Sequence, residues 1–508
     1  CAMRGSRVLL VLLAAAALAN LAFAGARRIA YPYDLEWMEG GVLCHALRLV
    51  HGEPIYAEPS ARFVSFAYTP LYPAVLWALS PVFGLGYLPA RSVSVAAFAW
   101  ALVVAYLFVR REGGSRAVAL GAAALPAAAF APTGAWYDLV RVDSLFLGLL
   151  ASAVAVGWWT RNGARGPVAA GALMTAAFFA KQTALPFAVV LGLVLLVSRR
   201  RAAAVYAATV VMLGAALLAW LHAASGGWFW TYAFALHRRH PFEVAAAALV
   251  TPARLALLLA PGLLLLAWAL ARAPRTGLLY ASALAVTGVV AAALGAGTEW
   301  SYHNALIPGV YFVSMAIGVA ATELEGRPAA PLLLAATVAT APGGLVALAQ
   351  RVLPERSAAS LALPLGYDLR GLVPSAADRT RGAALVARLT AAPGEVFVPD
   401  HSFYPHLAGK DTRLHAMNLA DLQGAGMKVP RDLVEEVRQR RFSLIVVDRE
   451  EPARGADPSG RPGPEDEAIG LLPGVSKHYR LAERIDGPRV FSGGRFVPCC
   501  LLVPRDEP

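Results

Sequence analysis

The stretch Tyr33-Asp34-Leu35-Glu36-Trp37-Met38-Glu39-Gly40-Gly41 decides how the rest of the chain is interpreted. Three carboxylates fall within six positions, and the first long apolar run ends only a few residues earlier, near residue 25. A dense acidic cluster beside a membrane surface costs solvation free energy and favours tuning of proton affinity. The stretch is therefore interpreted as a site. Which side of the membrane it occupies determines where the other segments lie.

The composition defines the class of protein. Of 508 residues, 58% are hydrophobic and only 15% are charged, and the mean hydropathy is +0.55. Soluble domains carry more charge and rarely contain repeated apolar runs of membrane-spanning length. The net charge of +12 would indicate nucleic-acid binding in a soluble chain, but here much of the excess lies in short Arg-rich loops, where it is a topology signal.

Apolar runs recur along the first 350 residues. Length and hydropathy predict roughly eleven spans, at about 8–25, 91–109, 117–133, 143–160, 167–180, 184–197, 203–221, 253–271, 276–295, 305–321 and 330–349. The predicted fold is a polytopic α-helical membrane protein with about 11–13 transmembrane helices and a small C-terminal α/β domain. The run at 8–25 is interpreted as an uncleaved anchor helix, with a signal peptide as the alternative.

Arginines mark one face of the predicted helices. If the spans alternate, the basic loops share one side, which the positive-inside rule makes cytoplasmic; they hold Arg4 and Arg7, Arg110–Arg116, 161–165, 199–201, Arg272–Arg275 and Arg327. The periplasmic face then receives the first loop (26–68), Trp136–Arg141, Lys181-Gln182, 222–243, 298–304 and the C-terminal tail. This predicts a multi-pass protein of the bacterial inner membrane whose site and C-terminal domain are extracytoplasmic.

Two regions depart from simple spans. Thr69–Phe83 is apolar but short and contains three prolines, so it is interpreted as a partial or interfacial helix, with a crossing paired with another short helix as the alternative. The runs 167–180 and 184–197 are each too short to cross a bilayer about 30 Å thick vertically. They predict a hairpin with Lys181-Gln182-Thr183 at its tip.

The composition changes near Val352, where charges become frequent and patterns of soluble type begin. The predicted boundary separates a transmembrane catalytic domain (1–350) from a periplasmic α/β domain (351–508). The patterns of the second domain predict helices at Ala376–Leu389 and Pro430–Arg441, strands at Glu395–Val398 and Phe442–Val447, a mobile loop at Glu451–Asp466, and closing strands within 487–504.

Polar residues suited to phosphate chemistry gather on the predicted outer face. Besides the acidic stretch, this face holds carboxylates, cations, histidines and an amide: Asp138, Arg141, Asp143, Lys181, Gln182, His237, Arg238, Arg239 and His303. Cations can hold a phosphate or pyrophosphate headgroup, while a carboxylate takes the proton of an incoming hydroxyl. The lipid tail of such a substrate would lie in the bilayer beside the site.

The order of these motifs resembles that of bacterial GT-C membrane glycosyltransferases of the protein mannosyltransferase and aminoarabinose-transferase type, glycosyltransferase family 39 and its relatives. The resemblance covers about residues 1–350. It is carried by Asp34-Leu35-Glu36 with Glu39-Gly40, Gly52…Tyr56, Tyr68-Thr69-Pro70-Leu71-Tyr72-Pro73, Asp138…Arg141-Val142-Asp143-Ser144 and Lys181-Gln182-Thr183. No single motif is specific; their order on one membrane side is the signal.

The resemblance implies an inverting transfer of a sugar from a polyprenyl-phosphate donor to a hydroxyl-bearing envelope acceptor at the periplasmic face. It also implies a general base in the first outer loop, for which Asp34 is the best positional match. The family often has adjacent Asp-Glu there, whereas this chain has Asp-Leu-Glu and a further Glu39, so Glu36 and Glu39 remain alternatives. Asp34, Asp138 and Asp143 are compatible with a divalent metal, although no ligand spacing demands one. No nucleic-acid partner is expected.

Structural interpretations stand beside the functional ones. Asp138 and Asp143 flank Arg141 and are equally compatible with an ion pair that caps the next helix. His237–His240 is compatible with an anchor to anionic lipid, and His303 with a packing role. Two other functions are kept as alternatives, a lipid or solute transporter and a non-catalytic envelope scaffold. Transporters place charges near the bilayer midplane, whereas these spans are almost free of charge away from their ends.

Overall fold

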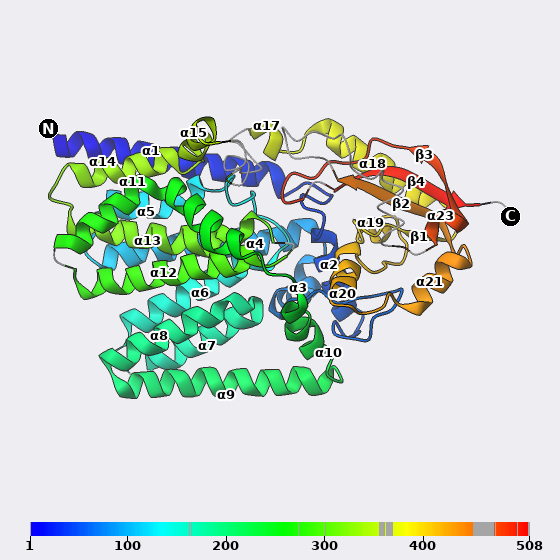
Figure 1. The fold of residues 1–508 in the computed structure, drawn as a ribbon, viewed down its shortest axis with the longest axis horizontal. Helices are drawn as coiled ribbons and strands as arrows, with labels where there is room; N and C mark the ends of the chain where they lie inside the picture. The colour runs from blue at the N-terminus through cyan, green and yellow to red at the C-terminus, as the bar shows by residue number, and fades with distance from the viewer. Residues whose placement is uncertain are drawn as a thin grey trace.

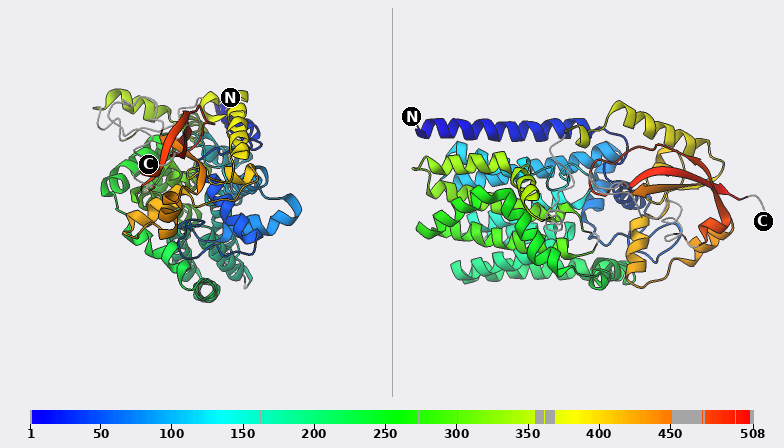
Figure 2. Two further views of the ribbon diagram at one scale, coloured as in Figure 1. Left: turned by 90° about the vertical axis from the view of Figure 1, so that its right-hand side faces the viewer. Right: turned by 45° about the horizontal axis from the view of Figure 1, so that its top comes forward.

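The computed structural model describes residues 2–354, 361, 369–450, 472, 474–494 and 496–505, apart from 162, 164, 273 and 300. Long helices run side by side through most of its length, and a small sheet with short helices lies at the end opposite the N-terminus (Figures 1 and 2).

The membrane half contains α1 (Ala2–Arg28), α2 (Glu39–Val50), α3 (Leu71–Phe83), α4 (Tyr87–Arg111), α5 (Arg116–Ala128), α6 (Val142–Trp159), α7 (Arg165–Ala180), η1 (Gln182–Ala184), α8 (Leu185–Ser198), α9 (Arg200–Ala224), α10 (Trp228–Trp230), η2 (Thr231–Ala235), η3 (His237–Arg239), η4 (Ala246–Val250), α11 (Thr251–Arg272), α12 (Thr276–Gly297), η5 (His303–Leu306), α13 (Ile307–Glu323), α14 (Ala329–Thr340) and α15 (Gly344–Val352). The C-terminal part contains α17 (Leu369–Leu372), α18 (Ala376–Ala391), β1 (Glu395–Phe397), α19 (Tyr404–Leu407), α20 (Ala416–Gly424), α21 (Arg431–Arg438), β2 (Phe442–Glu450), α23 (Val475–His478), β3 (Tyr479–Arg484) and β4 (Phe496–Pro504).

The predicted class, a polytopic α-helical membrane protein with a small C-terminal α/β part, is confirmed. Among the described residues, seven helical segments are long and apolar enough to cross a membrane: α1, α4, α6, α9, η4 with α11, α12, and η5 with α13. The bent pair α14–α15 adds an eighth if it counts as one span, and shorter apolar helices at α3, α5 and η1–α8 lie among them. The predicted number, about 11–13, requires shorter helices to cross as well and stays a prediction.

The apolar run at 330–349 is not the single straight helix that its length predicts. α14 and α15 meet at a bend of 70°. The segment between them, Ala341-Pro342-Gly343, explains the break, because proline lacks the N–H that a continuing helix needs and Gly343 adopts φ +102°. The prediction was wrong here in shape, though not in the position of the apolar residues.

α13 forms the centre of the bundle and packs against α12, α11 and α5. Close approach to α12 depends on Gly288, since a Cβ there would lie 2.7 Å from the carbonyl oxygen of Pro308. The outer helices instead present apolar side chains outward, as Met212 and Trp220 of α9 do at 70% and 63% exposure. Exposed apolar surface on this scale is expected where lipid is the solvent.

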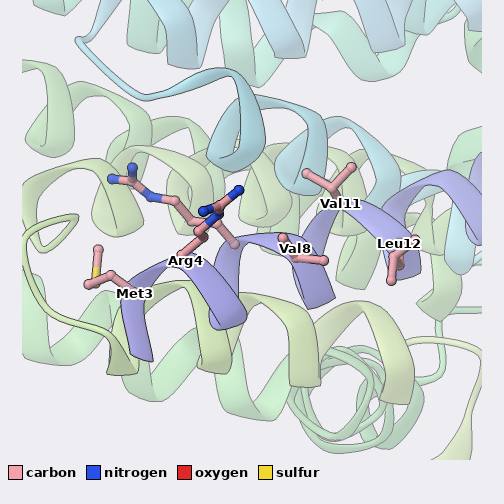
Figure 3. Close-up of a pocket in the computed structure, with 6 residues that line it drawn as sticks. Met3, Arg4, Val8, Val11 and Leu12 are labelled. Atoms are coloured by element: carbon pink, nitrogen blue, oxygen red, sulfur yellow. The ribbon is translucent and has the colours of Figure 1, made fainter. Parts of the chain in front are cut away.

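The two ends of the bundle differ in chemistry. The end that carries the N-terminus holds the basic loops, which pair with acids there: Arg7 lies 2.9 Å from Glu325, and Arg275 lies 3.1 Å from Glu323. A surface hollow of about 470 Å³ along the start of α1 also lies at this end (Figure 3), lined by Met3, Arg4, Arg7, Val8, Val11 and Leu12. The acidic stretch lies at the other end. The two-faced arrangement predicted from the loops is present, and its cytoplasmic and periplasmic labels stay predictions.

α3 does not cross the bundle. Its Tyr72 donates a hydrogen bond of 3.0 Å to the carbonyl of Ala90, and Tyr87, which follows α3 by four residues, donates one of 2.8 Å to Asp34 in the acidic stretch. Tyr87 and Ala90 share one turn of α4, so both ends of α3 lie at the same end of the bundle. Its last residues, Val82 and Phe83, are exposed, as expected for a helix at the membrane interface.

The C-terminal part is a four-stranded sheet in the order β1-β2-β4-β3, with β1 parallel to β2 and the other pairs antiparallel. The predicted helices correspond to α18 and α21, and the predicted strands to β1 and β2. Of the closing strands predicted within 487–504, β4 is the one found among the described residues, while β3 and α20 are additional. The loop predicted at Glu451–Asp466 lies outside the described residues.

Candidate functional site

The acidic stretch is not an exposed loop. All nine residues from Tyr33 to Gly41 are buried, because the stretch lies between the helical bundle and the C-terminal part. The C-terminal part covers it with backbone contacts: the N–H groups of Phe491 and Ser492 donate to the carbonyl of Leu35 at 2.7 and 3.0 Å. The ring of His415 contacts the carbonyl of Trp37 at 3.1 Å. The stretch is therefore held from both sides.

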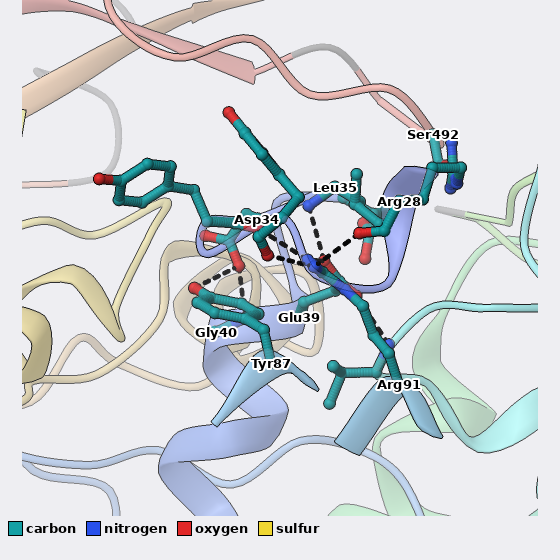
Figure 4. A network of polar contacts seen from close by, with 12 residues as sticks. Arg28, Asp34, Leu35, Glu39, Gly40, Tyr87, Arg91 and Ser492 are labelled. Atoms are coloured by element: carbon teal, nitrogen blue, oxygen red, sulfur yellow. Dashed lines mark hydrogen bonds and ion pairs between the residues drawn. The ribbon is translucent and has the colours of Figure 1, made fainter. Parts of the chain in front are cut away.

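Two of its three carboxylates have both oxygens occupied. Figure 4 shows Asp34 beside Gly40 and Tyr87, and Glu39 beside Arg91. Oδ1 of Asp34 accepts from the backbone N–H of Gly40 at 2.9 Å and from Tyr87 at 2.8 Å, and Oδ2 lies 2.7 Å from Nδ1 of His401. Glu39 forms a two-pronged pair with Arg91, at 2.9 and 2.6 Å. The Asp34, Glu39 and Arg91 side chains are all fully buried.

Glu36 is the exception. Its Oε2 accepts from Arg141 at 3.0 Å, whereas its Oε1 is buried without a hydrogen bond of normal geometry from any described residue. Burial raises the pKa of Glu36 to about 7, against the opposing influence of the Arg141 guanidinium. A buried carboxylate with a free oxygen and a pKa near neutrality has the properties of a general base.

Arg141 connects Glu36 to a set of polar side chains beside the start of α6. Its Nη2 donates to the hydroxyl of Tyr68 at 2.9 Å, and its guanidinium lies 5.2 Å from the centre of the Trp136 ring. Its Nε is buried without a hydrogen-bond partner among the described residues. Burial alone would lower the pKa of Arg141, but Tyr68 and Glu36 outweigh it and raise that pKa, so the guanidinium is charged.

Asp143 accepts the hydrogen bonds on the other side of this set. It accepts from Lys181 at 2.6 Å, from the indole N–H of Trp136 at 2.9 Å and from Asn304 at 3.2 Å. Lys181 keeps 17% of its side chain exposed, whereas the Arg141 side chain keeps 3%. Lys181 lies between α7 and η1, at the position predicted for the tip of the two short runs, and its contact with Asp143 places it at the first turn of α6.

The remaining predicted residues lie around this set or apart from it. Asp138 is held by Arg28 at 2.6 and 3.1 Å, and Gln182 donates to the carbonyl of Ala233 at 3.0 Å. On η3, His237 contacts the carbonyl of Ala67, next to Tyr68, at 2.6 Å. Two arginines follow it: Arg238 is exposed, and Arg239 donates to the carbonyl of Ala425 in the C-terminal part. His303 precedes Asn304, and a Cβ on Gly134 would lie 3.7 Å from it.

The three aspartates that were compatible with a metal do not converge. Asp34 contacts His401, Asp138 contacts Arg28 and Asp143 contacts Lys181. Within the described ranges, no group of three or more His, Cys, Asp and Glu side chains is arranged to hold a metal ion.

Sequence reasoning did not single out His401 or the partner arginines. Arg28 and Arg91 stand at the ends of apolar runs, where they resemble ordinary flanking charges. His401 follows β1, and Asp448 lies near the end of β2. Because the carboxyl ends of neighbouring parallel strands meet at one edge of a sheet, their closeness was a detectable signal once the two strands were predicted.

Neither a protein-family model nor a curated protein matches the sequence. Comparison with solved structures shows that the fold is that of ArnT.

The chain is similar over nearly its whole length to ArnT from Cupriavidus metallidurans. The crystal structure of ArnT bound to undecaprenyl phosphate aligns with a TM-score of 0.56 and 16% identity, covering 96% of this chain and 97% of ArnT. The apo structure aligns with a TM-score of 0.59 and 15% identity, covering 97% of each chain. At this identity the likeness concerns the fold, and the coverage includes the C-terminal part.

Proposed function

We propose that the protein is an inverting glycosyltransferase of the periplasmic face that moves a sugar from a polyprenyl-phosphate donor to a hydroxyl acceptor. The observation that carries this proposal is the arrangement of Glu36, Arg141 and Lys181. A carboxylate with one free buried oxygen lies beside one buried cation, and a second, partly exposed cation is linked to it through the Trp136–Asp143 contacts. The ArnT fold supports the class of enzyme, and the undecaprenyl phosphate bound by ArnT supports the class of donor.

The chemistry follows from these groups. The acceptor hydroxyl attacks the anomeric carbon while its proton passes to Oε1 of Glu36. The bond from the anomeric carbon to the phosphate oxygen breaks, and its electron pair leaves with the polyprenyl phosphate. Arg141 and Lys181 neutralise the charge of that phosphate. Attack opposite the leaving group inverts the anomeric centre, so one base and a cationic phosphate site are sufficient.

Among the three carboxylates of the acidic stretch, Glu36 is our choice for the base. Asp34 is the best match by family position, but its two oxygens already have three partners. Glu39 is fully paired with Arg91. An acceptor could reach Asp34 only if these partners gave way. A surface groove of about 400 Å³ is lined by Tyr87, one of those partners, so Asp34 remains the alternative that an experiment has to exclude.

The test is transfer of radiolabelled sugar from polyprenyl-phosphate donors in membranes. Removal of a general base typically costs about 10²–10⁴-fold in rate, so Glu36→Gln should reduce transfer by that factor. Glu53→Gln is the matched control, because Glu53 is a first-loop glutamate whose side chain is half exposed and forms an ion pair with the partly exposed Arg48. It should stay within about twofold of wild type. If Glu36→Gln retained transfer while Asp34→Asn abolished it, the base would be Asp34. Absence of transfer in folded wild-type protein with every donor would reject the proposed activity.

A further inference from the structure

Asp34, His401 and Asp448 form a buried chain of ionisable side chains between the two parts of the molecule. Nδ1 of His401 lies 2.7 Å from Oδ2 of Asp34, and Nε2 lies 2.9 Å from Oδ2 of Asp448. The three side chains are 0%, 0% and 1% exposed. We call these three residues the clasp. A histidine with a carboxylate on each nitrogen and no access to water is costly unless it is charged.

The charge state of His401 follows from its neighbours. Burial alone would lower the pKa of His401, but Asp448 and Asp34 outweigh burial and raise that pKa well above its usual value. The ring also stacks on Tyr404, with ring centres 5.0 Å apart. His401 is therefore an imidazolium that donates from Nδ1 to Asp34. Its Nε2 faces Asp448 as an ion pair, without a hydrogen bond of normal geometry.

The clasp joins segments that are far apart in sequence. Asp34 belongs to the acidic stretch, His401 to the turn after β1, and Asp448 to β2, which is the parallel neighbour of β1. The sheet thus sets the position of His401 through two of its strands. The turn that carries His401 packs tightly against the acidic stretch, because a Cβ on Gly40 would lie 3.0 Å from the Cβ of Phe403.

The acidic stretch depends on this contact for its position. Asp34 accepts from the N–H of Gly40 through the oxygen that His401 does not contact, so Asp34 closes the turn that contains Glu36. Glu36 has a single side-chain contact with a cation, Arg141, within the described residues. Its orientation is therefore set largely by the backbone of the turn.

We propose that His401 is a positioning residue, which fixes the acidic stretch through Asp34 and so makes the C-terminal part an obligatory half of the site. The proposal deepens the proposed function, because it assigns a role to residues outside the membrane half. It also has a consequence for conformation that does not depend on any transfer reaction. Without the clasp, the acidic stretch should separate from the turn after β1 more often.

A native cysteine reports that separation. Cys44, on α2 directly after the acidic stretch, is 5% exposed, and its Sγ lies 3.4 Å from the carbonyl of Ser402, next to His401. The rate of Cys44 alkylation by a maleimide, located by peptide mass spectrometry, measures the opening of this contact. His401→Gln should raise that rate about tenfold or more, because it leaves two buried aspartates without their cation.

The matched control is His478→Gln. His478 lies on α23, which packs against α21 and β3. This variant should alkylate Cys44 at the wild-type rate and transfer sugar at the wild-type rate. Asp448→Asn serves as the second variant should His401→Gln fail to fold. It keeps the shape of the side chain and removes one of the two carboxylates that face His401. Like His401→Gln, it should raise the rate of Cys44 alkylation.

Transfer assays separate positioning from simple loss of protein. For properly folded His401→Gln, kcat should fall about tenfold or more while KM for the donor stays within about twofold, since the phosphate cations are unaltered. The effects of Asp34→Asn and His401→Gln on kcat should be strongly non-additive, because both substitutions break the same Asp34–His401 contact. Unchanged Cys44 alkylation in both His401→Gln and Asp448→Asn would overturn the proposal, as would additive effects on kcat. If wild type transfers no sugar, the proposed function fails, and the alkylation experiment still decides whether the clasp exists.

Discussion

Glu39→Gln is the substitution whose effect the structure specifies in most detail. Oε1 of Glu39 accepts from Nε of Arg91 at 2.9 Å and from the N–H of Val140 at 2.8 Å. Oε2 accepts from Nη2 of Arg91 and from the N–H of Leu35, both at 2.6 Å. All four partners are donors. A glutamine amide presents an NH₂ group to one pair of them, whichever way it is turned, and it leaves the guanidinium without a counter-charge.

The size of the effect follows from burial. Both side chains of the Glu39–Arg91 pair are fully buried, and removal of one partner of such a pair costs about 3–5 kcal/mol. Since each 1.4 kcal/mol is a factor of ten, the unfolding equilibrium constant should rise by roughly two to more than three powers of ten. Arg91 also donates to the carbonyls of Tyr31 and Tyr33 at 2.5 and 2.6 Å, so the loss should spread to the start of the acidic stretch.

The assay is denaturant or thermal unfolding of the purified protein in detergent, followed by tryptophan fluorescence. Glu53→Gln is again the control, because its partner Arg48 and Glu53 itself are partly exposed, and it should change the free energy of unfolding by about 0.5 kcal/mol or less. Wild-type stability in Glu39→Gln combined with loss of sugar transfer would refute the reasoning. It would mean that Glu39 acts in catalysis and that its pairing with Arg91 is not what holds this region together.

Three further predictions concern pH and packing. Burial raises the pKa of Glu36 to about 7, so a base at this position is protonated and lost as the pH falls through that value. The rate of sugar transfer should therefore fall about tenfold for each pH unit below 7. A transfer rate independent of pH in this range would exclude Glu36 as the base. Gly40→Ala should lower the free energy of unfolding by about 1–3 kcal/mol, because the added Cβ would press on Phe403. Gly25→Ala on α1 is the control and should be neutral or stabilising, since no atom lies within 4 Å of its Cβ. Equal unfolding midpoints for the two variants would contradict the close packing at Gly40. Burial raises the pKa of Asp421 from 3.8 to about 7, so the stability that this group contributes is complete at low pH and is lost as the pH rises from about 4 through 7. In thermal melts, Asp421→Asn should therefore lose less stability over this range than wild type, and identical slopes would refute this prediction.

Local patterns in the sequence predicted most of the fold. Apolar runs with basic flanks predicted the positions of the long helices, because in lipid every backbone group must be satisfied within its own helix and only apolar faces are stable. The same reasoning missed the bend between α14 and α15, because hydropathy contains no information on backbone geometry. The residues that indicated the bend were Pro342 and Gly343. It also placed the acidic stretch in an outer loop without showing that the C-terminal part buries it.

The site was harder to predict, because its chemistry depends on pairs that are distant in sequence. The residue types do not distinguish Asp34, Glu36 and Glu39. In the fold, one contacts a histidine 367 residues away and one pairs with Arg91 52 residues away. Among the described residues, only Glu36 has an oxygen without a hydrogen bond of normal geometry. Clustering identified the right stretch, and the family resemblance identified the right kind of fold. Neither could rank the carboxylates, since ranking requires knowing which cation each one contacts.

The burial of the acidic stretch also constrains how the protein is made. In the finished fold Arg28 donates to Ser492 and Asp34 contacts His401. These partners are synthesised 464 and 367 residues later in the chain. At a typical rate of about 5–20 residues per second, the ribosome needs roughly 20–90 seconds to deliver those partners. During that interval the acidic segment is uncovered, and Arg28, although its partner Asp138 has already been made, lacks the contact with Ser492. A nascent chain that stalls before the sheet is complete therefore exposes a charged surface that the finished protein buries, and this surface distinguishes the incomplete chain from the finished one.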